Sequence, residues 1–301
     1  MKILITGTTG YIAKRLVLKL QEAGHQLVCC VRDLQRIPDE IEHKKNIEFV
    51  KVDFLDTKEI VLPNDIDVAY YLIHSMATDA VNFEDLEQNC AKNFKSLVEK
   101  TNCKQVIYLS GIVNDSSLSK HLASRFQVEQ NLQSIKYALT TFRAGIIVGS
   151  GSASFEIIRD IVEKLPVMVT PKWLNTKSQP IAIRDVLTFL ERAVANDKLY
   201  NKSFDICGTE VLTYKQMLLQ FAEVRGFKRY ILTLPLLSPK LSSYWLYFVT
   251  STSFNLAQAL VDSMKVEVIA KPSNINQILN IQPIPYKESV DLAFQRIEQN
   301  T

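Results

Sequence analysis

Short apolar runs rich in β-branched residues alternate with longer segments of helical periodicity in the first half of the chain. This alternation predicts βαβ units and a doubly wound parallel sheet, an α/β fold class. Between the first two runs, Ile12, Leu16, Leu20 and Ala23 share one helical face, which predicts an amphipathic helix that ends at Gly24. The strands expected are KILIT (2–6), QLVCCV (26–31), IEFVKV (47–52), DVAYYLI (67–73), QVIYLS (105–110) and YALTTFR (137–143).

The pattern changes after about residue 150. A loop and helix are expected over 150–166, a turn-rich connection over 169–180, a short strand and helix over 181–196, a strand at 203–207 and a helix over 213–224. Asp185 lies near the expected start of the helix within 181–196, where a carboxylate interacts favourably with the helix dipole. We therefore expect one domain over 1–150, to which 179–207 returns, and a smaller mixed region over 151–301 above the carboxyl edge of the sheet.

Composition and charge narrow the possible partners. The chain has 301 residues, 47% of them hydrophobic, and a net charge of +3, which is too small and dispersed to favour nucleic acid or an anionic membrane. Five cysteines without a C-x-x-C motif favour a reduced, cytoplasmic compartment and no zinc site. The longest apolar stretch, 232–250, contains two prolines and a lysine, so no integral membrane segment is expected. The start of the chain does not resemble a secretory signal.

The sequence TGTTGYIA places Gly7, Gly10 and Ala13 between the first strand and the first helix. A dinucleotide needs a turn without a Cβ, a backbone that approaches its pyrophosphate, and a small residue where helix meets strand. The N–H groups at the helix start would hold the phosphates. This context predicts a Rossmann-type NAD(P)-binding domain over 1–150 and a substrate-binding region over 151–301. A glycine turn without a ligand is the alternative.

The residue after the second strand selects between the two dinucleotides. Arg32 stands there, ahead of Asp33, which favours NADP with NAD still possible; a solvated arginine without a ligand is the alternative. Asp53, after the third strand, is placed to bond the adenine or to cap a turn.

These residues carry a family resemblance. TGTTGYIA, Arg32, VDFLD and FRAGIIVGSG resemble the short-chain dehydrogenase/reductase superfamily in its extended and atypical branches. More narrowly, YYLIHSM, HLASR, QPIAIRDVL and LSSYW resemble the atypical YbjT-like group, which has His-x-x-x-Arg where other members have Tyr-x-x-x-Lys. The resemblance covers nearly the whole chain and implies NAD(P) binding and an oxidoreductase role. Ala13 departs from the usual glycine of the family but remains small.

His121 and Arg125 are the pair at that position, four residues apart on one helical face beside the apolar row Leu118, Leu122 and Phe126. Histidine exchanges a proton near pH ~6.5 without assistance, and the charge of Arg125 would disfavour the imidazolium. The hypothesis is hydride transfer with His121 relaying the proton and Arg125 anchoring ribose hydroxyls or a substrate oxygen. The alternative is an ordinary helical histidine and a surface ion pair of Arg125 with Glu129.

Further candidates lie at the carboxyl ends of strands. Ser110 ends the fifth strand. Its main expected role is as a neighbour of the cofactor, and a catalytic role is the second expectation. Arg143 is expected to begin a loop whose N–H groups, at residues 149–152, would face an anion or the nicotinamide carboxamide, or else form a lid. Trp173 and the aromatic residues at 244–248 would wall an apolar substrate cleft or fill a core. The cofactor contacts expected are Gly7, Thr9, Gly10, Tyr11, Ile12, Arg32, Asp53, Phe54, His74 and Ser75.

Two functions are consistent with these features. The first is an NADP-dependent oxidoreductase acting on a small carbonyl, alcohol or quinone substrate, with a quinone or another apolar compound expected if the aromatic residues line the cleft. The second is a non-catalytic, NADP-binding redox sensor similar to NmrA-like regulators, which the loss of Tyr and Lys favours. Oligomer formation is possible under either hypothesis.

Overall fold

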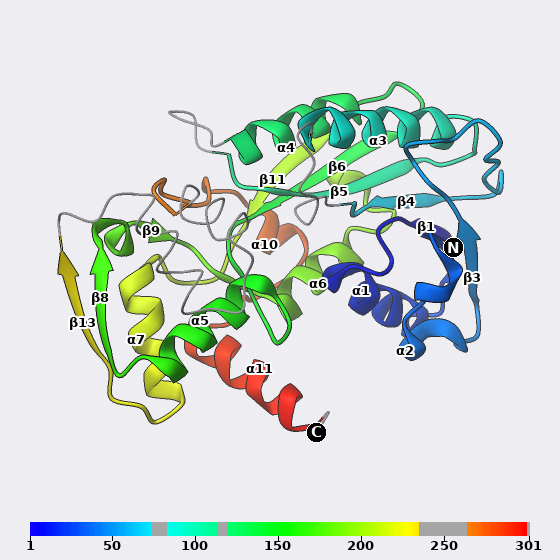
Figure 1. Cartoon of the computed structure of the whole chain (residues 1–301). Helices are drawn as coiled ribbons and strands as arrows, with labels where there is room; N and C mark the ends of the chain where they lie inside the picture. The colour runs from blue at the N-terminus through cyan, green and yellow to red at the C-terminus, as the bar shows by residue number, and fades with distance from the viewer. Residues whose placement is uncertain (74–82, 114–119, 235–263, 300–301) are drawn as a thin grey trace.

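The computed structural model describes residues 1–73, 83–113, 120–234 and 264–299. Its centre is a seven-stranded, wholly parallel sheet in the order β3-β2-β1-β4-β5-β6-β11 (Figure 1). The strands are β1 (Lys2–Ile5), β2 (Gln26–Val31), β3 (Ile47–Lys51), β4 (Val68–Tyr71), β5 (Gln105–Gly111), β6 (Ala138–Ala144) and β11 (Lys202–Ile206).

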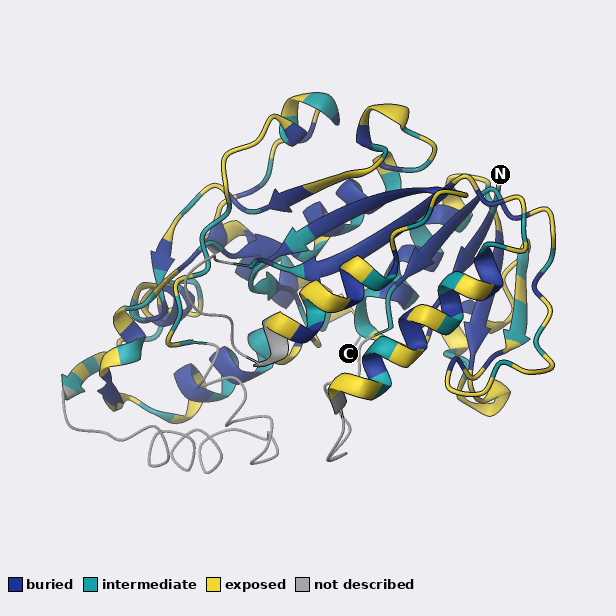
Figure 2. Ribbon diagram, turned by 90° about the horizontal axis from the view of Figure 1, so that it is seen from above, coloured by how far each residue is buried: buried dark blue, intermediate teal, exposed yellow. Residues whose placement is uncertain are grey.

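Helices cover both faces of the sheet (Figure 1). Successive residues of the strands alternate between the two cores: Ile3 and Ile5 pack on one side and Leu4 on the other. Burial on both faces explains why the inner strands β1, β2, β4, β5 and β6 are mostly apolar, and Figure 2 shows the inner strands buried. One side is covered by α1 (Tyr11–Glu22), α6 (Ile183–Arg192) and α10 (Ile275–Ile278), the other by α3 (Phe83–Val98) and α4 (Lys120–Asn131).

A smaller lobe has its own core around Phe155, Phe221 and Phe294, whose ring centroids lie 5.4–5.5 Å apart. The lobe contains α5 (Ala153–Lys164), α7 (Tyr214–Val224), α11 (Tyr286–Gln299) and the parallel pair β8 (Val167–Pro171) and β13 (Tyr230–Leu234). Short pairs join β7 (Ile147–Val148) to β10 (Ile181–Ala182) and β9 (Lys177–Ser178) to β12 (Leu212–Thr213). The connections include α2 (Asp39–Glu42) and three 3-10 turns, η1 (Leu34–Arg36), η2 (Lys172–Asn175) and η3 (Asp197–Leu199).

The predicted doubly wound α/β fold is confirmed, and all six expected strands form within one or two residues of their predicted bounds. The helix expected over 213–224 begins with a capping box in which Thr213 and Gln216 bond reciprocally. The stretch 169–180, expected as a turn-rich connection, contributes the end of β8 and all of β9, because β8 pairs with β13 about sixty residues later and β9 pairs with β12. The division of the chain at residue 150 stays a prediction.

Trp173 is half-buried and packs against the core of the smaller lobe, edge-on to Tyr214 with ring centroids 6.2 Å apart. The core interpretation of this aromatic residue is therefore the one that the structure supports. Residues 244–248 lie outside the described part of the chain. Within the described residues, no helix has the length and apolar character needed to cross a membrane, and no three metal-ligating side chains cluster together.

Candidate cofactor site and active site

The glycine turn joins the end of β1 to the start of α1 and passes close to the end of β4. Gly7 has φ +66°, and a Cβ on it would lie 2.6 Å from the carbonyl oxygen of Leu72. Gly10 is the N-cap of α1, and its N–H donates to the Gly7 carbonyl at 2.8 Å. The two glycines thus fill positions where a side chain would collide with backbone, which the TGTTG motif predicts.

Two buried threonines brace this turn. The Thr6 hydroxyl donates to the Tyr70 carbonyl at 3.0 Å and accepts from the Leu72 N–H at 3.0 Å. The Thr8 hydroxyl donates to the Ile5 carbonyl at 3.1 Å. The sequence analysis missed both residues, although the hydroxyl side chains within the motif were a signal for them.

The turn fits the pyrophosphate of a dinucleotide. The first N–H groups of α1 have no acceptor within their own helix, and Gly10 has no side chain to cap them. Thr9 and Gly10 are exposed, Tyr11 and Ile12 are half-buried, and the first turn of α1 contains no acidic residue. The turn also lies at the switch point of the sheet, because β1 stands between β2 and β4. The unpaired N–H donors, the exposed turn and its place at the switch point of the sheet therefore all match an anionic ligand.

Arg32 and Asp53 follow the carboxyl ends of the neighbouring strands β2 and β3. Arg32 is exposed and has no ion pair or hydrogen bond with any residue that the structure describes. Both residues act on the nearby Cys90 thiol, whose pKa is raised to about 11: burial is the largest cause, Asp53 also raises the pKa and Arg32 lowers it. The contact of Arg32 with a ribose 2′-substituent stays a prediction, and no partner among the described residues occupies its guanidinium.

The other acidic and aromatic groups at this edge already have roles. The Asp33 carboxylate caps η1 by accepting from the Gln35 N–H at 3.0 Å, and the Asp53 carboxylate accepts from the Leu55 N–H at 2.9 Å. Asp53 thus fills the turn-capping role, with adenine contact still a prediction. The ring of Phe54 is buried, and its centroid lies 5.8 Å from that of Phe94. A cofactor contact by Phe54 would therefore use its backbone.

Arg125 lies against the carboxyl end of β5. Its Nη1 donates to the Leu109 carbonyl at 3.4 Å, while the Tyr108 hydroxyl donates to the Arg125 backbone carbonyl at 3.3 Å. The neighbouring Ser110 hydroxyl is buried and makes no hydrogen bond to the described residues. His121 lies one turn earlier on α4, but its side chain, like His74 and Ser75, lies outside what the structure describes. The structure therefore brings together Arg125 and Ser110 of the predicted catalytic residues.

The alternative prediction of a surface ion pair between Arg125 and Glu129 is wrong. The Glu129 side chain is buried and accepts two hydrogen bonds from Arg143, at 3.0 Å from Nε and 2.8 Å from Nη2. Ser203 donates to the same carboxylate at 2.6 Å. Arg143 itself lies within β6, so the prediction that it begins a loop is wrong. Phe126, expected in a buried row, is 39% exposed.

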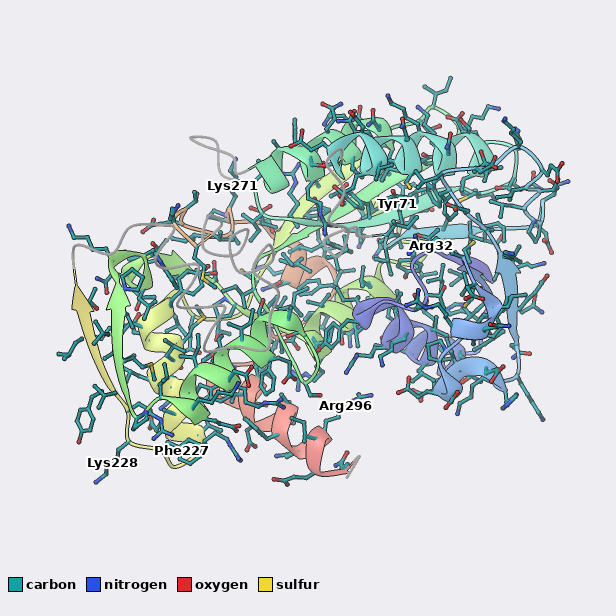
Figure 3. All side chains as sticks on the ribbon, in the orientation of Figure 1. Arg32, Tyr71, Phe227, Lys228, Lys271 and Arg296 are labelled. Atoms are coloured by element: carbon teal, nitrogen blue, oxygen red, sulfur yellow. The ribbon has the colours of Figure 1, made fainter. Side chains whose placement is uncertain are left out.

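Buried phenols lie below the same edge. Burial raises the pKa of Tyr108, an effect that the charge of Arg125 opposes, and burial raises the pKa of Tyr71 well above its ordinary value. Both phenols stay protonated at neutral pH, so they serve as hydrogen-bond donors and not as bases. Figure 3 shows Tyr71 beneath α3 and Arg32 on the same lobe.

The loop after β7 is fixed to α1. The Arg15 Nη2 donates to the Ser150 carbonyl at 2.9 Å, and a Cβ on Gly149 would lie 2.5 Å from the Tyr11 hydroxyl oxygen. Two of the loop N–H groups expected to face an anion are already bonded: Gly151 donates to Glu156 at 2.7 Å and Ser152 to the Gly149 carbonyl at 3.0 Å. The loop thus offers fewer free donors than its sequence predicts.

Comparison with known proteins agrees with this site. Residues 7–145 match a family described as NAD(P)H-binding. The chain is 24% identical over 219 residues to the photosystem II assembly factor Ycf39 of Synechocystis, an alignment that covers 69% of this chain and 63% of that protein. The chain therefore spans less than two thirds of the length of this curated relative.

Solved structures show the same fold. UDP-glucuronic acid 4-epimerase from Bacillus cereus, in complex with UDP-glucuronic acid and NAD, has a TM-score of 0.74 at 15% identity over all of both chains. UDP-glucose 4-epimerase from Thermotoga maritima has a TM-score of 0.74 at 14% identity, over 100% of this chain and 99% of that one. Residues 7–145 thus match an NAD(P)H-binding family, and the solved structures share the fold of the whole chain.

Proposed function

We propose that this chain is an NADP-dependent oxidoreductase that acts on a small carbonyl or quinone. The observation that carries the proposal is the position of Arg125, whose guanidinium contacts the end of β5, two strands along the sheet from the strand that begins the glycine turn. Arg125 follows His121 by four residues on α4, so both belong to the helix face that would meet a nicotinamide ring.

The roles divide among three groups of residues. Gly7, Gly10 and the first N–H groups of α1 hold the pyrophosphate, and Arg32 pairs with the 2′-phosphate of NADP. When bound, the nicotinamide supplies or accepts a hydride. Arg125 anchors ribose hydroxyls or a substrate oxygen, and it cannot act as a base because it stays protonated.

His121 relays the proton. The high pKa values of Tyr71 and Tyr108 support this assignment, because neither phenol exchanges a proton at neutral pH. An imidazole exchanges a proton at neutral pH without an activating lysine, which accounts for the missing Tyr-x-x-x-Lys pair. The buried Ser110 hydroxyl lies at the carboxyl end of β5 without a hydrogen-bond partner among the described residues, and it assists as a donor to the substrate oxygen.

The test is NADPH oxidation against a panel of quinones, aldehydes and ketones, beside binding titrations with NADP and NAD. The proposal expects oxidation with at least one class of acceptor and tighter binding of NADP than of NAD. Because the solved structures with this fold include UDP-sugar epimerases, UDP-glucose and UDP-glucuronic acid form a further arm. NADPH binding with no turnover of any acceptor would instead support the sensor function.

A further inference from the structure

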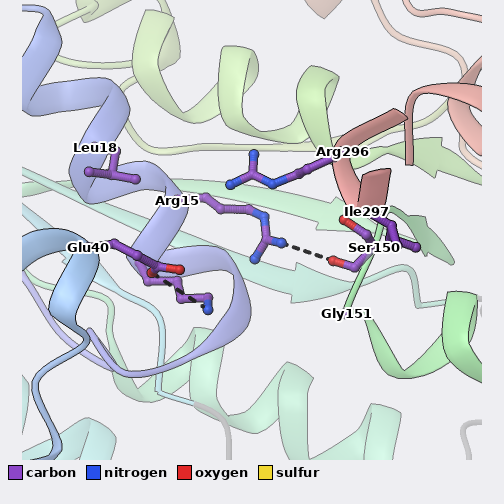
Figure 4. A pocket seen from close by; sticks show the side chains of 8 residues that line it. Arg15, Leu18, Glu40, Ser150, Gly151, Arg296 and Ile297 are labelled. Atoms are coloured by element: carbon purple, nitrogen blue, oxygen red, sulfur yellow. Dashed lines mark hydrogen bonds and ion pairs between the residues drawn. The ribbon is translucent and has the colours of Figure 1, made fainter. Parts of the chain in front are cut away.

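A pocket of about 340 Å³ lies between α1, α11 and the loop after β7 (Figure 4). It is separate from the glycine turn, because its lining on α1 begins at Lys14, a full turn after Gly10. The residues that line it are Lys14, Arg15, Leu18, Glu40, Ser150, Gly151, Arg296 and Ile297.

The charges around this pocket are unbalanced. Lys14, Arg15 and Arg296 face it with three positive charges, and Glu40 is the one carboxylate in its lining. The Lys14 Nζ lies 3.8 Å from Glu40, beyond hydrogen-bond distance. Arg296 is exposed and has no ion pair or hydrogen bond within the described chain. The pocket therefore presents an uncompensated positive charge.

Arg15 is held in a fixed position at the wall of the pocket. Its Nη1 donates to the Tyr11 carbonyl at 3.0 Å and its Nη2 to the Ser150 carbonyl at 2.9 Å, while its guanidinium carbon lies 4.1 Å from the centre of the Tyr11 ring. None of these partners carries a formal negative charge. Burial lowers the pKa of Arg15 first, and the nearby charge of Arg296 lowers it further. Figure 4 shows the two arginine side chains side by side in the pocket.

We propose that this pocket binds a phosphorylated small molecule, whose phosphate group lies between Arg15 and Arg296 and so links α1 to α11. Two guanidinium groups that lie side by side repel each other, Glu40 offsets only part of the positive charge, and an anion between the arginines lowers the cost further. Guanidinium donors also match the oxygen geometry of phosphate. The volume exceeds that of a bare phosphate, and Leu18 and Ile297 provide apolar surface for the rest of the ligand.

The experiment titrates the purified chain with inorganic phosphate and with pyrophosphate by calorimetry, at constant ionic strength maintained with chloride. The proposal expects saturable binding at one site outside the glycine turn. Arg296→Gln should weaken pyrophosphate binding about tenfold, since it removes a charge-assisted hydrogen-bond partner. Arg296→Lys should retain most of the affinity, and Glu40→Gln should tighten binding because it removes the opposing carboxylate.

Lys228→Gln is the matched control, since it removes an exposed positive charge at the far end of the smaller lobe (Figure 3). It should leave pyrophosphate binding unchanged. The titration is repeated with NADP at saturation, because the glycine turn also attracts phosphate. Competition by NADP, equal binding by wild type and Arg296→Gln, or no saturable binding at all would each overturn the proposal.

Discussion

Glu129 and Arg143 form a two-hydrogen-bond ion pair between α4 and β6, with Oε2 to Nε at 3.0 Å and Oε1 to Nη2 at 2.8 Å. Only 5% of the Glu129 side chain and 19% of the Arg143 side chain is exposed. The pair fixes α4 on the sheet, and because it occupies Glu129, Arg125 is left to contact the end of β5. A structural ion pair thus positions the helix that carries the proposed active-site residues.

Breaking this pair should destabilise the fold. Glu129→Ala leaves the half-buried guanidinium of Arg143 without this partner, and we expect the free energy of unfolding to fall by about 3 kcal/mol. Replacing both residues, by Glu129→Leu with Arg143→Met, should restore part of that loss. The exposed pair of Lys287 and Glu223 is the control, and Lys287→Ala should cost less than about 1 kcal/mol. Urea unfolding measures each variant, and equal losses for Glu129→Ala and Lys287→Ala would contradict the prediction.

This pair also shows where sequence reasoning reaches its limit. The spacing of Arg125 and Glu129 suggests a local ion pair, but Arg143 competes from a neighbouring strand and Ser203 from another. Which partner prevails depends on tertiary burial, and helical spacing contains no information about it. The contact of Arg15 with Ser150, 135 residues later, is similarly invisible in the sequence.

The strands of the fold are far more predictable from the sequence than these long-range side-chain contacts. Strands buried on both faces are apolar at most positions, so the runs in the sequence mark them directly. The glycine turn was predictable as well, because Gly7 and Gly10 occupy positions that exclude a side chain. The pairing of β8 with β13 was not, because it joins segments about sixty residues apart in a separate small sheet.

Gly7→Ala should abolish cofactor binding. The added Cβ meets the Leu72 carbonyl oxygen at 2.6 Å and the backbone has φ +66°, so the turn must move away from its phosphate-binding shape. Gly24→Ala is a matched control: its φ is +83°, but a Cβ there has nothing within 4 Å. We expect Gly24→Ala to cost about 1 kcal/mol of stability and to bind NADP normally. Fluorescence titration with NADPH distinguishes the two; retained binding by a folded Gly7→Ala protein would refute the assignment.

Arg32→Gln should reduce the affinity for NADP about tenfold or more while leaving that for NAD almost unchanged, because a charged hydrogen bond to the 2′-phosphate is lost. Lys45→Gln is the charge-matched control, since this exposed lysine precedes β3 and so lies at the opposite edge of the sheet. Its dinucleotide affinities should equal those of the wild type. If Arg32→Gln weakens both dinucleotides equally, Arg32 does not select NADP.

Stability should fall at alkaline pH. Burial raises the pKa of the Cys29 and Cys103 thiols from 9.0 to about 12. Above pH 9.0 the unfolded chain therefore loses these protons while the folded chain keeps them, so the free energy of unfolding decreases as pH rises from 9.0 toward about 12. Cys103→Ala should make this decrease shallower in urea unfolding measured across that range. An identical pH slope in the variant and the wild type would show that folding does not raise the pKa of this thiol.

His121→Phe should lower kcat by about 100-fold or more, the usual contribution of a positioned acid or base, while NADP affinity changes little. Arg125→Lys keeps the positive charge but loses the planar donors, so it should raise KM or weaken NADP binding more than it lowers kcat. His43→Phe is the matched control, because this exposed histidine follows α2 far from the end of β5. Steady-state kinetics with the acceptor identified in the NADPH panel separates these effects. If His121→Phe turns over at the wild-type rate, the proton must come from another group, and the Ser110 hydroxyl beside Arg125 becomes the next residue to replace.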